Sequence, residues 1–151
     1  MSSRARFRDR LEEARLVHLD ARIVAYHLLA EAQYADLTGL LFRGLETGDV
    51  AGQTSAVTLY QLLVEPYRQG RTEAANRAAD YLSAFRHLEL VPVHPELATQ
   101  AAQVRARLGG RVERALQIAT ALDREADVYL TEDSGLRRVA GMEIVSLEDY
   151  L

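Results

Sequence analysis

Hydrophobic and polar positions along the chain follow two different periods. Short apolar runs bounded by polar residues or glycine occur at residues 16–19, 89–93, 128–131 and 143–147, and together with the segment 50–56 they predict five strands. Apolar residues spaced three or four apart predict a pair of helices in each of the first three gaps. Residues 134–139 then form a turn or short helix. Right-handed crossovers between such strands build an α/β fold, a doubly wound, mostly parallel five-stranded sheet with helices on both faces.

Glycine and proline mark several expected helix ends. Gly48 follows the helix predicted over residues 34–47, in the position of a C-cap. Pro66 is expected to kink or end the helix that begins near Val57, because proline lacks the backbone N–H of an intrahelical hydrogen bond. Another helix is predicted over residues 72–88, and Pro95 stands where a further helix begins.

The first 14 residues differ in composition from the rest. They contain four arginines and few large apolar groups, so they are predicted to form a frayed or helical, solvated N-terminal arm. The 151-residue chain is 48% hydrophobic, which is enough for one domain with one core, predicted over residues 15–151.

Charge and cysteine content exclude several classes of protein. A net charge of −4 argues against a protein that coats nucleic acid through bulk positive charge, and the absence of cysteine excludes disulfides and thiolate metal sites. No apolar run approaches the roughly 20 residues that span a bilayer, and the N-terminus lacks a signal peptide's apolar core. We therefore expect a soluble, cytoplasmic protein with no membrane partner.

Two acids stand where predicted strands end. Asp20 follows the first strand and Asp133 follows the strand at residues 128–131. If the first strand is central, these two strands are neighbours, and ligands of doubly wound sheets bind at such strand ends. Asp20 and Asp133 are therefore candidate site residues.

Four segments together resemble the PIN domain of VapC-type toxins. They are Leu19-Asp20, the run from Thr54 to Leu59, the run from Ala115 to Leu122, and Leu130 to Asp133 followed by Gly135-Leu136-Arg137-Arg138. The resemblance extends from about Leu16 to Leu151, so the domain of residues 15–151 is expected to be PIN-like. It implies a Mg- or Mn-dependent ribonuclease, the toxin of a toxin–antitoxin pair, acting as a homodimer. In such a site four acids hold the divalent cation through oxygen ligands.

The chain departs from this pattern at several positions. Asp20 and Asp133 match the first and last acids, and Thr131 matches a small hydroxyl residue beside the last. The second acid, normally Glu, falls on Gln61, and the third, normally Asp, falls on Arg114. Ala21 and Arg22 replace the small polar residues expected after the first acid.

These departures change the charge of the site. Four carboxylates would carry four negative charges, whereas two carboxylates beside Arg22 and Arg114 are neutral in sum. An arginine offers only hydrogen-bond donors and keeps its proton. Arg114 is therefore predicted to pair with Asp20 or Asp133 and to take the position of the metal.

Three other acids could stand in for the missing ones. Glu113, Glu65 and Glu132 are all expected to be solvated, and Glu113 is the best placed of them. The four histidines share no ligand spacing and are expected at the core edge or on the surface. Tyr26, Tyr34, Leu37 and Leu41 are expected to pack onto the sheet, with an exposed dimer seam as the alternative.

Two functions remain open. The first is a PIN-like protein with a degenerate acidic site, a weak or inactive nuclease that acts by binding RNA, an antitoxin-like protein or its own copy. The second is an active Mg- or Mn-dependent endoribonuclease toxin of a type II toxin–antitoxin pair that uses Asp20, Asp133 and Glu113. Without the metal-dependent activity, no cofactor is expected.

Overall fold

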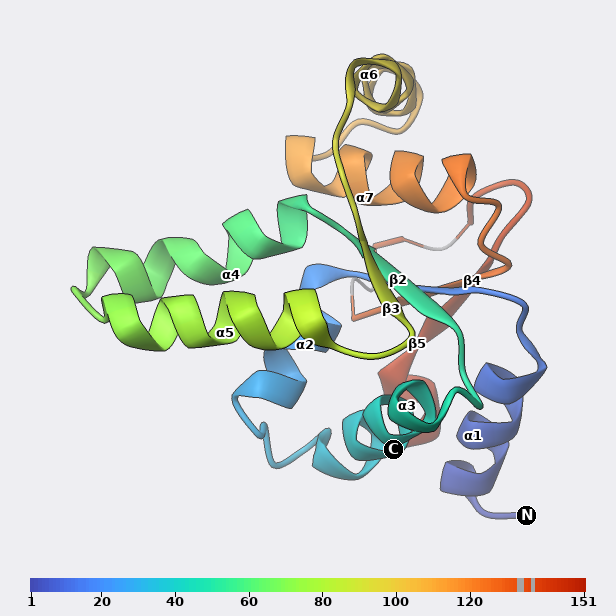
Figure 1. Ribbon diagram of the computed structural model, residues 1–151. Helices are drawn as coiled ribbons and strands as arrows, with labels where there is room; N and C mark the ends of the chain where they lie inside the picture. The colour runs from blue at the N-terminus through green and yellow to red at the C-terminus, as the bar shows by residue number, and fades with distance from the viewer. Residues whose placement is uncertain (133–134, 137) are drawn as a thin grey trace.

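The computed structural model describes residues 1–132, 135–136 and 138–151 and contains a five-stranded parallel sheet (Figure 1). The strand order is β3-β2-β1-β4-β5, and each of the four described strand pairs is parallel. The strands are β1 (Val17–Leu19), β2 (Gly52–Ser55), β3 (Leu88–Val91), β4 (Val128–Thr131) and β5 (Glu143–Ser146). The predicted fold is confirmed. Strand β1 is the central strand and lies beside β4, so the carboxyl ends of these two strands are neighbours, as predicted.

Helices cover both faces of the sheet. Figure 1 shows α7 and α6 stacked on one face, α3 and α1 on the other, and α4 and α5 side by side at the edge. The helices are α1 (Ser3–Glu13), α2 (Ala21–Leu28), α3 (Ala35–Thr47), α4 (Val57–Arg68), α5 (Thr72–Ala84), α6 (Pro95–Leu108) and α7 (Val112–Asp123), followed by the 3-10 helix η1 (Leu147–Tyr150). None of those in the described ranges has the length and apolar character needed to cross a membrane.

Most predicted boundaries agree with the structure, with two differences. Gly48 closes α3 with a left-handed φ of 87°, and α6 begins at Pro95. Helix α4 does not end at Pro66 but continues to Arg68, and Gly70 follows with a φ of 74°. Helix α5 ends at Ala84 rather than near residue 88, because the chain turns there into β3.

The N-terminal segment is an ordered part of the core rather than a solvated arm. Phe7 and Leu11 of α1 are 0% and 1% exposed and pack in the same apolar cluster as α3 and η1. Arg4, Arg6 and Arg8 point to solvent, while Arg10 pairs with Glu143 of β5. The two apolar side chains lie one helical turn apart and therefore share the buried face of α1.

The two faces of the central strands differ in chemistry. Val17 and Leu19 of β1 point into the large apolar cluster, while His18 between them points toward α7. In register with His18 lie Gln53 of β2 and Tyr129 of β4. A row of polar and aromatic side chains therefore faces α7, where most buried sheets would present aliphatic residues.

The aromatic and leucine residues of α2 and of the start of α3 pack inward. Tyr34, Leu37 and Leu41 are buried, and Tyr26 stacks on Tyr34 with ring centroids 4.4 Å apart. The prediction that these side chains pack onto the sheet is confirmed for Tyr34, Leu37 and Leu41.

Candidate functional site

A cleft of about 630 Å³ opens at the carboxyl ends of β1 and β4. We refer to it as the strand-end cleft. It is bordered by the start of α2, by α4, by the start of α7 and by the end of β4. Six of the residues predicted from the sequence line it together: Asp20, Arg22, Gln61, Glu113, Arg114 and Thr131. Asp133 lies outside the described residues, so its predicted place in the site is untested.

Asp20 is held in place by hydrogen bonds to both carboxylate oxygens. It is the N-cap of α2, and its Oδ1 accepts from the backbone N–H groups of Arg22 (3.1 Å) and Ile23 (3.4 Å). The Thr131 hydroxyl, at the end of β4, donates to Oδ2. The positive end of the α2 dipole stabilises the carboxylate as an anion. Asp20 and Thr131 are therefore hydrogen-bonded to each other across the ends of β1 and β4.

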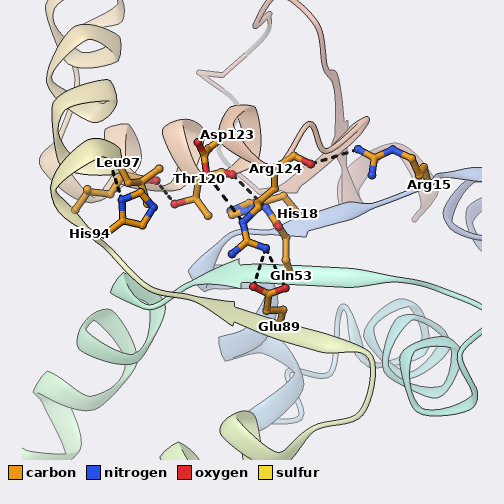
Figure 2. Close-up of polar contacts among 10 residues, drawn as sticks. Arg15, His18, Gln53, Glu89, His94, Leu97, Thr120, Asp123 and Arg124 are labelled. Carbon is orange, nitrogen blue, oxygen red and sulfur yellow. Dashed lines mark hydrogen bonds and ion pairs between the residues drawn. The ribbon is translucent and has the colours of Figure 1, made fainter.

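His18 is fully buried, so its predicted place at the core edge or surface is wrong. Its Nε2 lies 2.8 Å from Gln117 Oε1. Its Nδ1 lies 3.0 Å from Nε2 of Gln53, which Figure 2 shows beside it. Its ring stacks on Tyr129, with centroids 5.1 Å apart. Burial lowers the pKa of His18 to about 4, although the hydrogen bond with Gln117 acts in the opposite direction. The ring is therefore neutral at neutral pH.

Hydrogen bonds connect His18 to the strand-end cleft through α7. Gln117 is 2% exposed, and its Nε2 donates to Thr58 Oγ1 (2.8 Å) and to Gln61 Oε1 (3.2 Å). Thr58 Oγ1 lies 2.7 Å from Thr54 Oγ1. We call the connected side chains of His18, Gln53, Thr54, Thr58 and Gln117 the buried polar network. Gln117 also lines the cleft, and through Gln61 the network reaches the exposed part of its wall.

The sequence-based prediction did not include Gln53, Thr58 or Gln117 as site residues. The available signal was alternation in β1 and β2, which puts His18 and Gln53 on the face opposite Leu19. Two polar side chains on the buried face of neighbouring strands require partners. Only the structure shows that Gln117 of α7 supplies one of them.

Two of the possible stand-in acids line the cleft. The Glu113 carboxylate lies 3.9 Å from Arg111 Nε, and its side chain is 27% exposed. Glu132 is only 9% exposed, so the prediction of a solvated carboxylate is wrong for it. Burial raises the pKa of the Glu132 carboxyl, while hydrogen bonds from the Tyr34 hydroxyl and from backbone N–H groups act to lower it. Glu65 is exposed and pairs with Arg68 at 2.8 Å, as expected of a solvated residue.

The described part of the cleft does not have the donor set of a site for a hard divalent cation. Within residues 1–132, 135–136 and 138–151, no three His, Asp or Glu side chains are grouped to hold a metal ion. Both oxygens of Asp20 and the oxygen of Gln61 already accept hydrogen bonds, and Arg114 contributes a guanidinium to the lining. The pairing of Arg114 with Asp20 or Asp133 stays a prediction.

Comparisons with known proteins agree with this fold. A structure of VapBC2 from Rickettsia felis bound to a promoter DNA fragment has a TM-score of 0.65 at 14% identity, covering 87% of this chain and 98% of that one. A toxin–antitoxin complex from Klebsiella pneumoniae has a TM-score of 0.61 at 14% identity, covering 87% and 97%. FitAB bound to the IR36 DNA fragment has a TM-score of 0.61 at 16% identity, covering 87% and 94%.

A search of curated protein sequences found no match. The model of the PIN domain family, however, matches residues 17–142, which include every strand up to β4 and the whole described lining of the cleft. The chain therefore belongs to the PIN domain family.

Proposed function

We propose that this protein is a VapC-like PIN-domain protein whose nuclease centre is weak or inactive, and that it acts by binding RNA or a protein partner. One observation carries the proposal. Two of the four positions at which the resemblance expects acids hold Gln61 and Arg114, and both residues line the same cleft as Asp20. A site for Mg or Mn at this place would therefore lack two of its four carboxylates.

A metal site at this cleft would have to bind the cation more strongly than water does. Mg²⁺ loses its hydration shell reluctantly and is held by carboxylate oxygens in nearly octahedral geometry. An amide oxygen carries no net charge, and a guanidinium repels the ion outright. Each replacement lowers the attraction of the cleft for the cation, and Arg114 reverses its sign locally.

The alternative is an active Mg- or Mn-dependent endoribonuclease toxin of a type II toxin–antitoxin pair. Asp20 with its Thr131 partner favours this alternative, and so does Glu113, which lines the same cleft. Asp133 would supply a further acid from the sequence.

The structural relatives support a protein partner. Their structures are of VapBC2, of FitAB and of a toxin–antitoxin complex, so an antitoxin-like protein is the partner we propose for this chain. A homodimer and an RNA ligand are proposed on the family resemblance.

A cleavage assay tests the choice. The wild type, Asp20→Asn, Arg68→Gln and the double variant Gln61→Glu/Arg114→Asp would be incubated with labelled single-stranded RNA, with Mn²⁺ or with EDTA. Arg68 is exposed on α4 and serves as a matched arginine control. We expect Mn-dependent cleavage from the double variant and little from the wild type. Strong wild-type cleavage that EDTA and Asp20→Asn abolish would instead establish the active toxin.

A further inference from the structure

The orientation of the Gln117 amide is fixed by a backbone carbonyl on one side. The carbonyl oxygen of Thr120 can only accept a hydrogen bond, and Gln53 Nε2 lies 3.4 Å from it. The same nitrogen donates to His18 Nδ1, so a neutral His18 carries its proton on Nε2. That N–H donates to Gln117, which must therefore present its oxygen to His18 and its nitrogen to α4.

The backbone carbonyl of Leu19 gives the same orientation of the Gln117 amide through a separate series of hydrogen bonds. The Thr54 hydroxyl donates to the carbonyl oxygen of Leu19 over 2.6 Å, so the bond between Thr54 and Thr58 must be donated by Thr58. The Thr58 oxygen then accepts from Gln117 Nε2 at 2.8 Å. Both routes therefore give the Gln117 amide one orientation.

This orientation determines what Gln61 offers to the strand-end cleft. Its oxygen accepts from Gln117 Nε2, so the amide nitrogen and its two protons remain for the cleft. The position where a metal-binding family member would present a carboxylate oxygen therefore presents a hydrogen-bond donor. A donor at this place suits an anion and disfavours a cation.

Positively charged groups surround the same space. Arg22, Arg111 and Arg114 line the cleft, and the first turn of α7 borders it. The N-cap of α7 is Arg111, whose side chain has no acceptor for the first N–H groups of the helix. Asp20 accepts from Thr131 and from the start of α2, and the Glu113 carboxylate lies 3.9 Å from Arg111 Nε. Glu132 accepts from Tyr34, while its buried Oε1 has no hydrogen-bond partner among the residues that the structure describes.

We propose that the strand-end cleft binds a phosphate group directly, through the Gln61 amide and the arginines around it, with no bridging metal ion. This inference rests on the proposed function, because it assigns a ligand to the same degenerate site. Arginine guanidinium groups and amide N–H groups both match the oxygens of a phosphate. The source of the phosphate is either an RNA strand or a small phosphorylated molecule.

Binding in EDTA tests the proposal without any contribution from a metal. Fluorescence anisotropy would measure a labelled single-stranded RNA, and calorimetry would measure inorganic phosphate and AMP. The variants are Gln61→Glu, Arg114→Gln and the control Arg107→Gln, which lies on the exposed side of α6 and not in the cleft. Gln61→Glu keeps the shape of the side chain and can still accept from Gln117, but its second oxygen places negative charge where the donor was.

We expect Gln61→Glu to weaken binding by at least about tenfold, the loss of a charge-assisted hydrogen bond, and Arg107→Gln to leave it unchanged. Arg114→Gln should also reduce the salt dependence of RNA binding, by a slope of about 0.7 for one phosphate contact. Loss of RNA binding alone in Gln61→Glu identifies a strand as the source, and loss of phosphate or AMP binding identifies a small molecule.

Absence of phosphate and RNA binding, or equal binding by wild type and Gln61→Glu, overturns the inference. These results are separate from those of the cleavage assay. A wild type that does not cleave RNA and binds neither RNA nor phosphate contradicts this inference only, whereas metal-dependent cleavage contradicts the proposed function.

Discussion

Gln117 Nε2 lies 3.2 Å from Gln61 Oε1, so the residue at the mouth of the strand-end cleft is oriented from inside the protein. Gln117 is itself fixed by His18 at 2.8 Å and by Thr58 at 2.8 Å. In this geometry the Gln61 oxygen accepts from Gln117, and its amide nitrogen is left for the cleft. The buried polar network sets the polarity of the cleft.

His18 should occupy one tautomer in the folded protein. In ¹⁵N NMR spectra of the folded protein at pH 7, the His18 ring should show a protonated Nε2 and an unprotonated Nδ1, because Gln53 donates to Nδ1. A protonated Nδ1 would reverse the orientation of Gln117 and contradict the account.

The same residue should make stability depend on pH. Its pKa in the fold is about 4, below the ordinary value of 6.5, so the stabilisation is complete above pH 6.5 and is lost as the pH falls toward 4. The free energy of unfolding should fall by up to roughly 3 kcal/mol over this window. Urea denaturation of the wild type, His18→Asn and the control Arg8→Gln, at an exposed residue, would measure this change in the free energy of unfolding. The control should keep the dependence and His18→Asn should lose it; an equal dependence in all three would show that His18 is not its source.

Glu132 should have the opposite effect. Because burial raises the pKa of its carboxyl, the fold holds this proton more tightly than the unfolded chain does. Its ionisation therefore destabilises the fold as the pH rises from about 4.5 through the raised pKa. Glu132→Gln should be more stable than the wild type at pH 7 and equal to it near pH 4. A variant that is less stable at pH 7 would show that Glu132 is needed as an anion.

Asp20 has a structural role that a nuclease assay must separate from catalysis. Asp20→Ala removes the cap of α2 and should cost about 1–2 kcal/mol in the free energy of unfolding. Asp20→Asn keeps an oxygen acceptor for the N–H groups of Arg22 and Ile23 and should cost much less. Thermal or urea unfolding of both variants measures the difference, and equal losses would exclude the cap as the cause.

Phe7 tests whether the N-terminal segment belongs to the domain. Its side chain is 0% exposed, so Phe7→Ala should cost about 3–5 kcal/mol, while the exposed neighbour Arg8→Gln should change stability by less than about 0.5 kcal/mol. Urea denaturation compares the two. A small loss in the free energy of unfolding for Phe7→Ala would support the prediction of a solvated N-terminal arm.

The sequence was sufficient for the fold and for much of the cleft, because both follow from local patterns. Short apolar runs predicted the strands, the end of the first strand pointed to Asp20, and the resemblance to the PIN domain added Thr131, Gln61 and Arg114. The burial of α1 was missed since only Phe7 and Leu11 carry its apolar face among four arginines. The environment of Glu132 was missed because β4 ends at Thr131, so alternation no longer decides which way the next side chain points. The buried polar network was missed because a partner on α7 is a tertiary contact.

The most direct test of the central claim, that the cleft has lost its preference for a metal ion, is a calorimetric Mn²⁺ titration. It would compare the wild type with Arg114→Asp and Gln61→Glu/Arg114→Asp. We predict no binding by the wild type and measurable binding by the variants, strongest in the double variant, because each change replaces a donor with a carboxylate. Wild-type binding at micromolar to low millimolar strength would contradict the account.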